Sequence, residues 1–531
     1  MKKKRICIAM AVLLLLGCMP IYAAADLNTI VLADERQTPR VTGGYPRFET
    51  LADGTLILLA GGGTFRRSSD NGKTWEQYSI AQNCQKIITT AGGTTHILSQ
   101  ENWQPYVLED GTVFAAYRSR TSASAYTSGK EFYTSIRVLK STDNGRTFAD
   151  EEILVESTPN YMHGYWEPIM MQIDENTVAL YYADDLNVDK VGPQQNINYV
   201  TYDIPSGKWD KTVRTAINGV VRNSRDGMPV ITKLSDGGFA MVVEAHDYAN
   251  RVYGNKYYSC RFVIGLSLSA DGRTWSNPIP VVVPEDTKSY LTCSAPFITT
   301  LPDGRVIISY QTDEDYVGAT KDASVDKNCV YGAVISDAPL TVNTVLTAST
   351  GGAAEGFTKI PDIFASTPNG YMIWNTVYCD GKYVYFAGGY GRNNSSGSAV
   401  RIRRATVYGT VLSMTVGATD YTLNGETKTM DVAPVIRNDR TMLPVRYVAE
   451  ALGADVAWDA ETSTATLTTD TVAIKITVGS STATVGGESV TLDAPAFIEN
   501  DRTYMPVRFV AEALGATVSW DGATATATIR K

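Results

Sequence analysis

The stretch EPIMMQIDENTVALYY, residues 167–182, holds two apolar runs on either side of the polar turn Asp174-Glu175-Asn176. Apolar and β-branched residues around a short polar turn are typical of two paired strands. The proline at position 168 stands at the head of the first run, where a missing backbone N–H is tolerated. The stretch therefore predicts an antiparallel β-hairpin.

Related hairpin sequences recur along much of the chain. Each has a residue–proline pair, an apolar strand, a turn centred on Asp-Gly or its equivalent, and a second apolar strand. The prolines stand at positions 46, 105, 168, 229 and 296, so neighbouring units are 59 to 67 residues apart. The other copies are YPRFETLADGT at 45–55, QPYVLEDGTVFAAY at 104–117, MPVITKLSDGGFAMVV at 228–243 and APFITTLPDGRVIISY at 295–310. A sixth, degenerate unit covers residues 372–386.

A second motif follows later in several units. It reads SSDNGKTW at residues 68–75, STDNGRTF at 141–148 and SADGRTW at 269–275, with shorter variants at 205–209 and 335–337. Its aspartate can accept hydrogen bonds from loop N–H groups, its glycine supplies a positive φ, and its Trp or Phe packs into the sheet. The motif resembles the Asp-box of sialidase-type propellers. We interpret these aspartates as structural, rather than catalytic or metal-binding.

The repeats predict the fold. Four-stranded sheets that recur about every 60 residues, without helical sequence between them, indicate a β-propeller. Six units predict six blades over roughly residues 30–411, with residues 401–408 as the last strand. We therefore expect an all-β, six-bladed, sialidase-like propeller with Asp-box repeats, assigned to residues 26–411, and a small α+β repeat domain at residues 412–531.

The C-terminal part has its own repeat. VIRNDRTMLPVRYVAEALG at residues 435–453 returns as FIENDRTYMPVRFVAEALG at 497–515, a period of 62 residues. In each copy a proline precedes a short helical pattern with one apolar face, and a glycine ends it. The motif resembles the copper amine oxidase N-terminal-like domain. That resemblance implies surface attachment, contact with the cell wall or another interaction, and no oxidase chemistry.

The N-terminus has the features of a secretory signal peptide. A basic start at residues 2–5 precedes an apolar run at 6–16, and small residues for cleavage stand at 23–25. We predict a signal peptide at residues 1–25 and a secreted or cell-surface protein, with lipoprotein anchoring at Cys18 as the alternative. The net charge of −9 argues against a nucleic-acid partner. Three histidines, and no Cys/His pairs at ligand spacing, predict no metal or other cofactor.

Two glutamates stand among aromatic or apolar residues. Glu167 lies in GYWEP at residues 164–168, and Glu244 lies in VVEAHD at 242–247. Glu167 is expected to open the inner strand of unit 3 and Glu244 to end the second strand of unit 4, so a propeller brings both to its axial face. Such a pair can divide acid and base roles and predicts glycoside hydrolysis. The structural alternative for Glu167 is a carboxylate that caps backbone N–H groups.

Further candidates for substrate binding occupy corresponding strand ends. They are Arg47, Trp103, Gln104, Tyr117, Arg118, Trp166, Tyr182, Asp184, Asp226, His246, Asp247, Tyr310, Asp313 and Trp374. Trp166 offers a plate for stacking on a sugar, and Arg118 could orient one carboxylate. Structural alternatives are that the tyrosines pack between blades, that Asp226 stabilises its own turn, and that His246 and Asp247 form a capped loop.

The contexts of the two glutamates lead to a family resemblance. WEP in unit 3, DGMPV at residues 226–230 and VVEAHD after it resemble glycoside hydrolase family 93, exo-acting α-L-arabinanases with a six-bladed propeller. The resemblance spans about residues 30–411. It implies retaining hydrolysis of α-1,5-linked L-arabinan by Glu167 and Glu244, with the nucleophile and the acid/base not assigned. It also implies a tyrosine from a later blade, either Tyr316 or Tyr310.

Two other functions fit the same sequence. A sialidase is the nearest alternative, but sialidases need an arginine triad that opens with Arg-Ile-Pro, and here Tyr45-Pro46-Arg47 has the reverse order. The other alternative is a non-catalytic carbohydrate-binding or adhesive propeller, presented at the cell surface by the C-terminal module. In all three cases the predicted partner is a polysaccharide or oligosaccharide.

Overall fold

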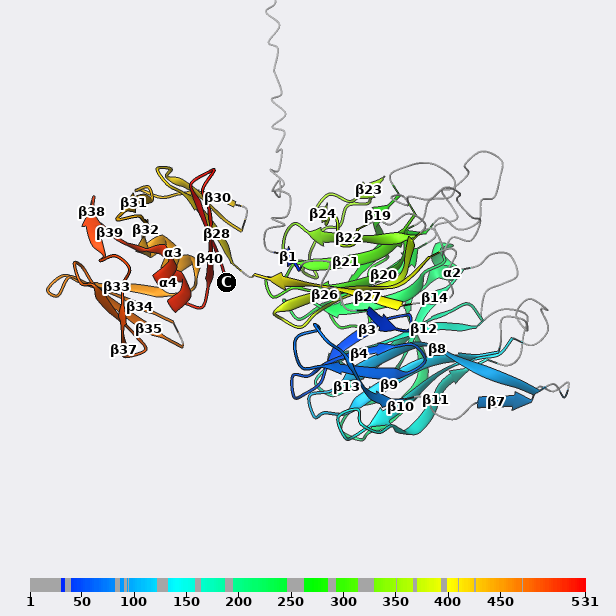
Figure 1. Ribbon diagram of the computed structural model, residues 1–531. Helices are drawn as coiled ribbons and strands as arrows, with labels where there is room; N and C mark the ends of the chain where they lie inside the picture. Colours follow the sequence, from blue (N-terminus) through cyan, green and yellow to red (C-terminus); the bar gives the residue numbers. More distant parts are fainter. Residues whose placement is uncertain are drawn as a thin grey trace, which may run out of the picture.

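The computed structural model contains two bodies of β-structure (Figure 1). It describes residues 30–33, 40–81, 86–89, 93, 95–121, 132–157, 164–186, 194–245, 262–284, 293–313, 329–349, 351–365, 370–392, 399–408, 410–424, 426–469 and 471–531. The predicted signal peptide with Cys18, and the candidates His246, Asp247 and Tyr316, lie outside these residues. Among the described residues, no helix has the length and apolar character that a membrane crossing requires.

Six antiparallel sheets, built mostly from consecutive strands, form the blades of the larger body. Blade 1 consists of β3 (Arg47–Thr50), β4 (Leu56–Ala60), β5 (Thr64–Ser68) and β6 (Glu76–Ile80), and blade 2 of β8 (Thr95–Val107), β9 (Val113–Arg120), β10 (Thr134–Ser141) and β11 (Ala149–Glu156). Blade 3 consists of β12 (Tyr165–Asp174), β13 (Thr177–Asp184), β14 (Asn196–Asp203) and β15 (Lys208–Ile217), and blade 4 contains β16 (Gly227–Lys233), β17 (Phe239–Ala245), β18 (Val263–Ser269) and β19 (Ile279–Val283). Blade 5 contains β20 (Cys293–Thr300), β21 (Val306–Thr312), β22 (Val330–Ser336) and β24 (Phe357–Lys359), and blade 6 contains β25 (Gly370–Cys379), β26 (Tyr383–Arg392) and β27 (Ala399–Val407). β7 (Lys86–Thr89) extends blade 2, β23 (Gly352–Ala353) extends blade 4, and α2 (Gly219–Arg222) connects blades 3 and 4.

The inner strands of the six sheets pack in a closed ring. β3 contacts both β8 and β25, and the contacts continue through β12, β16 and β20. The sixth blade takes its outer strands from the N-terminal side: β1 (Ile30–Leu32) and β2 (Arg40–Thr42) both pair with β27. Main-chain hydrogen bonds between the two ends of the domain therefore close the ring. The prediction of a six-bladed, all-β propeller is confirmed.

A β-bulge interrupts the inner strand of each of blades 2 to 6. Two residues of the inner strand there oppose one residue of the second strand. The first residue of the bulge has a left-handed backbone, and Tyr45 at the equivalent place in blade 1 shares it. These φ angles belong to Tyr45 (57°), Asn102 (55°), Glu167 (26°), Met228 (47°), Ala295 (46°) and Trp374 (56°). Proline suits the next position because a bulge tolerates a missing ladder hydrogen bond.

The bulge corrects two expectations about the repeat. The residue–proline pair lies inside the inner strand instead of opening it, since β12 begins at Tyr165 and Glu167 is in its bulge. In blade 2 the bulge consists of Asn102 and Trp103, so Pro105 is not the counterpart of Pro168. An alignment anchored on proline shifts this blade by two residues, because Trp103 occupies the proline position.

The Asp-box turns connect the third and fourth strands, on the face opposite to the bulges. In the first of them, Asp70 accepts hydrogen bonds from the N–H of Thr74 at 2.9 Å and from its hydroxyl at 2.7 Å. The turns also contact the preceding blade: the Tyr181 hydroxyl of blade 3 donates to the carbonyl of Gly272 in the box of blade 4. The motif aspartates therefore hold their own turns, as predicted, and the turns hold neighbouring blades together.

Loss of one Asp-box carboxylate should lower stability without affecting the opposite face. Asp143 accepts from the N–H of Thr147 at 2.9 Å and from its hydroxyl at 2.6 Å, and its pKa is lowered to about 2 by these bonds. Asp143→Ala should lose about 1–2 kcal/mol at neutral pH, seen as a lower melting temperature. Because the hydrogen bonds favour the ionised carboxylate, the stability difference between wild type and Asp143→Ala should shrink below about pH 4 and be nearly lost by pH 2. Glu109→Ala, at an exposed turn, is the control; an equal loss there would contradict the role of Asp143.

The smaller body is a module with an internal repeat. Helices α3 (Val445–Ala451) and α4 (Val507–Ala513) lie where the repeat predicts them, and each is followed by a glycine with positive φ. β28 pairs with the C-terminal β41, so the two ends of the module meet in one sheet. Its strands are β28 (Val411–Thr415), β29 (Asp420–Leu423), β30 (Glu426–Thr429), β31 (Val435–Arg437), β32 (Arg440–Pro444), β33 (Asp455–Asp459), β34 (Thr464–Thr468), β35 (Ala473–Thr477), β36 (Thr482–Val485), β37 (Glu488–Thr491), β38 (Phe497–Glu499), β39 (Arg502–Pro506), β40 (Thr517–Asp521) and β41 (Thr526–Arg530).

Candidate active site

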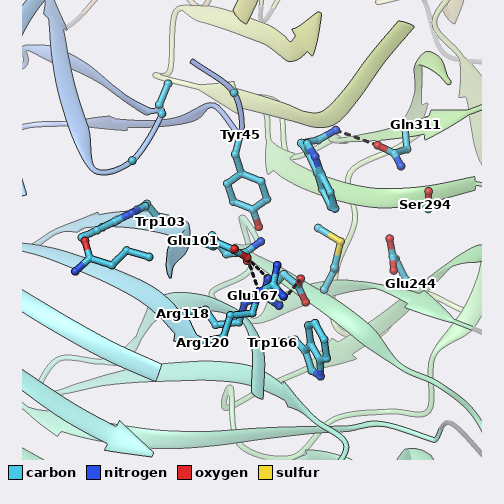
Figure 2. A pocket seen from close by; sticks show the side chains of 18 of the residues that line it. Tyr45, Glu101, Trp103, Arg118, Arg120, Trp166, Glu167, Glu244, Ser294 and Gln311 are labelled. Atoms are coloured by element: carbon cyan, nitrogen blue, oxygen red, sulfur yellow. Dashed lines mark hydrogen bonds and ion pairs between the residues drawn. The ribbon is translucent and has the colours of Figure 1, made fainter. Parts of the chain in front are cut away.

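A cavity of about 610 Å³ opens at the propeller axis, on the face where the bulges lie. All six blades contribute to its wall. Figure 2 shows Glu167 beside Arg118 and Trp166, with Glu244 across the cavity near Ser294. The lining residues are Gly44, Tyr45, Ala60, Gly61, Gly62, Gln100, Glu101, Asn102, Trp103, Arg118, Arg120, Trp166, Glu167, Arg225, Met228, Glu244, Phe262, Ser294, Gln311 and Trp374.

Two positions of the repeat bring the two carboxylates to this cavity. The first is the bulge residue of the inner strand, which is Glu167 in blade 3. The second is the residue of the second strand that pairs just outside the bulge, which is Glu244 in blade 4. The pairs at this second position are Glu101–Arg118, Gly227–Glu244 and Ser294–Gln311. Glu167 and Glu244 therefore face one cavity from neighbouring blades, as predicted from the topology.

The surroundings of Glu167 favour its protonated form. Its side chain is 15% exposed, and its Oε1 lies 3.9 Å from Nη1 of Arg118. Burial raises the pKa of Glu167 above its usual range. The charge of Arg118 opposes this rise, the negative charge of Glu244 adds to it, and Arg225 and Arg47 oppose it more weakly. A carboxyl that keeps its proton towards neutral pH can serve as a general acid.

Two partners hold the side chain of Glu244. Its Oε1 accepts a hydrogen bond from the backbone N–H of Ala295 at 2.7 Å, and its Oε2 lies 3.5 Å from Nη1 of Arg225. Both interactions stabilise the negative charge. Ala295 is the bulge residue of blade 5, so the bulge presents its N–H to the carboxylate. Glu244 is thus held in one orientation, across the cavity from Glu167.

A third carboxylate pairs with the two arginines of blade 2. Glu101 accepts from Nη2 of Arg118 at 2.6 Å and from Nε of Arg120 at 2.8 Å. Burial raises the pKa of Glu101, but Arg120 and Arg118 outweigh it and bring that pKa to about 2. Arg118 also stacks on Trp166, with its guanidinium carbon 4.6 Å from the ring centroid. Its Nε and Nη1 are buried and make no hydrogen bond to the described residues.

Aromatic side chains form the rest of the wall. The rings of Tyr45 and Trp374 approach each other with centroids 5.6 Å apart. Trp103 stacks on Tyr117, whose centroid lies 4.2 Å away. Aromatic faces beside charged hydrogen-bonding groups are suited to ligands that carry both apolar C–H faces and hydroxyl groups.

The structure brings part of the predicted set to the cavity. Glu167, Glu244, Trp103, Arg118 and Trp166 all line it, and so does Trp374 from the wider set of candidates. The wider candidates Gln104, Tyr117, Asp184 and Asp313 do not line it.

Two tyrosines predicted to bind substrate are instead structural. Tyr182 is fully buried and packs edge-on against Tyr165, with centroids 5.3 Å apart. The buried ring of Tyr310 lies over Gly332. Both stand opposite a bulge on a second strand, one residue before the position that faces the cavity. Since side chains alternate along a strand, they point between blades, which is the structural alternative that the sequence allowed.

Asp226 and Arg47 were also placed wrongly. Asp226 is fully buried and accepts hydrogen bonds from the Ser224 hydroxyl at 2.8 Å and from Arg222 at 2.5 Å. It therefore holds the turn before β16. Arg47 is 2% exposed and lies under Tyr45, 3.8 Å from its ring centroid. It does not reach the cavity wall and acts on the site through its charge.

Several lining residues escaped the sequence analysis. Gln311 carries the same repeat signal as Glu244, since both pair just outside a bulge, and Tyr45 and Met228 precede a proline as Glu167 does. Glu101 and Arg225 had no such signal, because their roles are ion pairs that depend on register. The missed residues with polar or aromatic side chains are Tyr45, Gln100, Glu101, Asn102, Arg120, Arg225, Phe262, Ser294 and Gln311. Within the described part of the chain, no group of three or more His, Cys, Asp or Glu side chains could hold a metal ion.

Comparison with known proteins gives one family match. The family model of the copper amine oxidase N-terminal domain matches residues 399–466 and 422–529. The first of these matches begins inside the propeller, because Ala399–Val407 is its last strand. No curated protein is similar enough to the chain to match it.

Solved structures with a similar fold include two enzymes from fungi. One is the GH93 α-L-arabinofuranosidase of Fusarium graminearum with arabinobiose, with 18% identity over 69% of this chain and 98% of that chain and a TM-score of 0.46. Another is the α-L-arabinanase of Penicillium chrysogenum with arabinobiose, with 18% identity over 70% and 96% and a TM-score of 0.46. The NanB sialidase of Streptococcus pneumoniae has 10% identity over 68% of each chain and a TM-score of 0.42. The propeller assignment follows from this chain's own sheet order and closed ring.

The charges around Glu167 predict how its pKa responds to substitution. Glu244→Gln removes a like charge and should lower the pKa of Glu167, whereas Arg118→Met removes a favourable charge and should raise it. NMR titration of the glutamate side-chain carbons in each variant measures both shifts. Glu109→Gln, which changes an exposed turn, should leave the pKa of Glu167 in place. Shifts of the opposite sign would contradict the electrostatic description of the site.

Proposed function

We propose that the protein is a secreted or cell-surface glycoside hydrolase that acts from the chain end on α-1,5-linked L-arabinan, with retention of configuration. The observation that carries the proposal is one axial cavity with two carboxyl groups in different surroundings: burial raises the pKa of Glu167, whereas a backbone N–H and Arg225 contact Glu244. The sugar, the linkage and the exo mode rest on the resemblance of WEP, DGMPV and VVEAHD to glycoside hydrolase family 93.

The two groups divide the chemistry of a double displacement. In the first step Glu244 attacks the anomeric carbon, Glu167 gives its proton to the departing glycosidic oxygen, and a covalent glycosyl–Glu244 ester forms. In the second step the Glu167 carboxylate takes a proton from water, whose oxygen attacks the same carbon and releases Glu244. Glu167 ends protonated again, so the site is ready for the next cycle.

The remaining wall supplies recognition. The rings of Tyr45, Trp374 and Trp166 offer faces for the C–H surfaces of sugars. A cavity of about 610 Å³ lies within the range of sites that hold small ligands, so it fits a short stretch of a sugar chain.

Three arginines at the cavity are the one feature that favours the sialidase alternative. Arg118, Arg120 and Arg225 line the wall, and sialidases bind a carboxylate with arginines. Each of these arginines, however, already faces a glutamate. Glu101, ionised down to about pH 2, offsets one of the two guanidinium charges of blade 2, and one of its oxygens engages both arginines, so they are not a free pair for the carboxylate of an acidic sugar. We therefore rank a neutral substrate above a sialoside.

Hydrolysis of debranched arabinan by the purified protein tests this function. Wild-type protein should release short arabinose oligomers or arabinose, detected by chromatography. Glu244→Gln should reduce the rate to background, and Glu167→Gln should lose about 10²–10⁴-fold. The control Glu109→Gln makes the same glutamate-to-glutamine change on the opposite face and should retain full activity. Full activity in either site variant, or turnover of sialosides alone, would overturn the proposal.

Azide rescue separates the roles of the two glutamates. Glu244→Gly should recover activity on an activated aryl arabinoside in the presence of azide, and the glycosyl azide should have the configuration opposite to that of the substrate, because azide attacks in place of Glu244. Glu167→Gly should give a glycosyl azide of retained configuration, since azide then attacks the covalent intermediate. NMR of the products distinguishes the two outcomes. The reverse pattern would exchange the assigned roles.

A further inference from the structure

The C-terminal module has an open groove of about 730 Å³ that the proposed hydrolysis does not use. It lies between the hairpin β31–β32 of the first repeat, helix α4 of the second repeat, and strands β37 and β40. Trp520 stands in its wall and is 42% exposed, and Phe509 lies in the same wall with its other side against the module core. An aromatic surface of this kind, inside a groove, is typical of a binding site.

The 62-residue repeat gives the module a second face of the same construction. Arg440 and Asp493 form an ion pair at 3.1 Å in the groove, and Arg502 pairs with Asp431 in the counterpart. Trp458 is the counterpart of Trp520 and is equally exposed, at 42%. The chain therefore carries an internal control for every residue of the groove.

The two faces differ where the groove is open. On the counterpart face the Tyr447 hydroxyl donates to Asp431 at 3.0 Å, and Tyr421 packs edge-on against Tyr447 with centroids 5.8 Å apart. The groove has Phe509 in place of Tyr447 and Ala483 in place of Tyr421. Val490 likewise replaces Lys428. The groove thus has smaller and less polar side chains at these positions than its counterpart, and Asp493 lacks the tyrosine that its counterpart Asp431 has.

We propose that this groove binds a neutral polysaccharide, the same polymer that the propeller cleaves. Trp520 would stack on the apolar face of a sugar ring, while Arg440 and Asp493 would exchange hydrogen bonds with its hydroxyl groups. The identity of the polymer rests on the proposed function. The groove itself rests on the observations above.

The charges of the groove favour a neutral ligand. Its wall carries two arginines and three carboxylates: Arg440, Arg508, Asp439, Asp493 and Glu512. Arg440 is paired with Asp493, and Arg508 lies 3.9 Å from Glu512. The arginines therefore leave no surplus positive charge for an anionic polymer, and the slight negative excess repels one. A hydroxyl-rich chain can use paired charged groups as donors and acceptors without disturbing the charge balance.

A second binding site on the same chain would raise the activity on long substrates. Once the groove holds a polysaccharide, the propeller meets further chain ends at a high effective concentration. Short substrates cannot reach both sites and gain nothing. The predicted signature is a loss of activity on polymer, with no loss on a small arabinoside, when the groove is altered.

Affinity electrophoresis of the full chain in gels with soluble debranched arabinan tests the groove. In a Glu244→Gln background, which prevents cleavage, Trp520→Ala should weaken retention by about tenfold. Trp458→Ala, the matched change on the counterpart face, should leave retention as it is. In the otherwise wild-type chain, both tryptophan variants should hydrolyse an aryl arabinoside at the normal rate. Equal retention of Trp520→Ala and its parent, or equal loss in both tryptophan variants, would overturn the inference.

A second substitution reproduces the counterpart face. Phe509→Tyr should place a hydroxyl towards Asp493, as Tyr447 does towards Asp431, and should reduce retention without removing any aromatic surface. Unchanged retention would count against the groove.

Hydrolysis of arabinan with retention independent of Trp520 would refute the groove and leave the proposed function standing. Trp520-dependent retention on another neutral polysaccharide, without cleavage of arabinan, would refute the function and the polymer identity but support the groove. Preference for an anionic wall polymer or a peptide would overturn the neutral-glycan assignment.

Discussion

A left-handed residue at the axial end of each inner strand is the constraint on which the site depends. The bulge of blade 3 turns the side chain of Glu167 to the axis. The bulges of the other blades free backbone N–H groups from the regular ladder. Two of these N–H groups bind side chains of the preceding blade: Ala295 donates to Glu244, and Trp374 donates to Gln311 at 2.9 Å. The same irregularity thus aims one carboxylate and anchors the other. Strained backbone is kept here because the closed ring of blades over-determines it.

The difference between the two glutamates comes from their partners, because both sit in the same buried cavity. Glu244 has a backbone donor at 2.7 Å and a nearby guanidinium, while Glu167 has Arg118 at 3.9 Å and a like charge facing it. Glu101 pairs with Arg118 and offsets part of its positive charge, which limits how far Arg118 lowers the pKa of Glu167. The two carboxyl groups of one cavity therefore have different electrostatic surroundings.

Repetition followed by divergence is common to both bodies of the chain. In the propeller, one register position carries Arg118, Glu244 and Gln311 in three different blades, so an unchanged scaffold supplies a cation, a carboxylate and an amide. In the module, the exchange of Tyr447 for Phe509 separates two faces of one construction. In each case a change to the repeated backbone would disturb the fold, whereas the exchange of one side chain does not. The chemistry of that position therefore varies while the backbone stays the same.

The six hairpins, the Asp-box turns, the two module helices and the pair Glu167 and Glu244 follow from sequence, because they depend on local alternation, turn chemistry and repeat position. The position of the bulge in blade 2 did not follow, since Trp103 replaces the proline that marks the bulge in blades 3 to 5. Tyr182 and Tyr310 were misplaced for a related reason: a one-residue step at the bulge exchanges the axial and interblade faces of a strand. The pairing of β1 with β27 and the ion pairs of Glu101 and Arg225 join groups whose approach depends on ring closure and register. Local sequence specifies the strands, whereas the direction of each side chain and the contacts between blades are set when the ring closes.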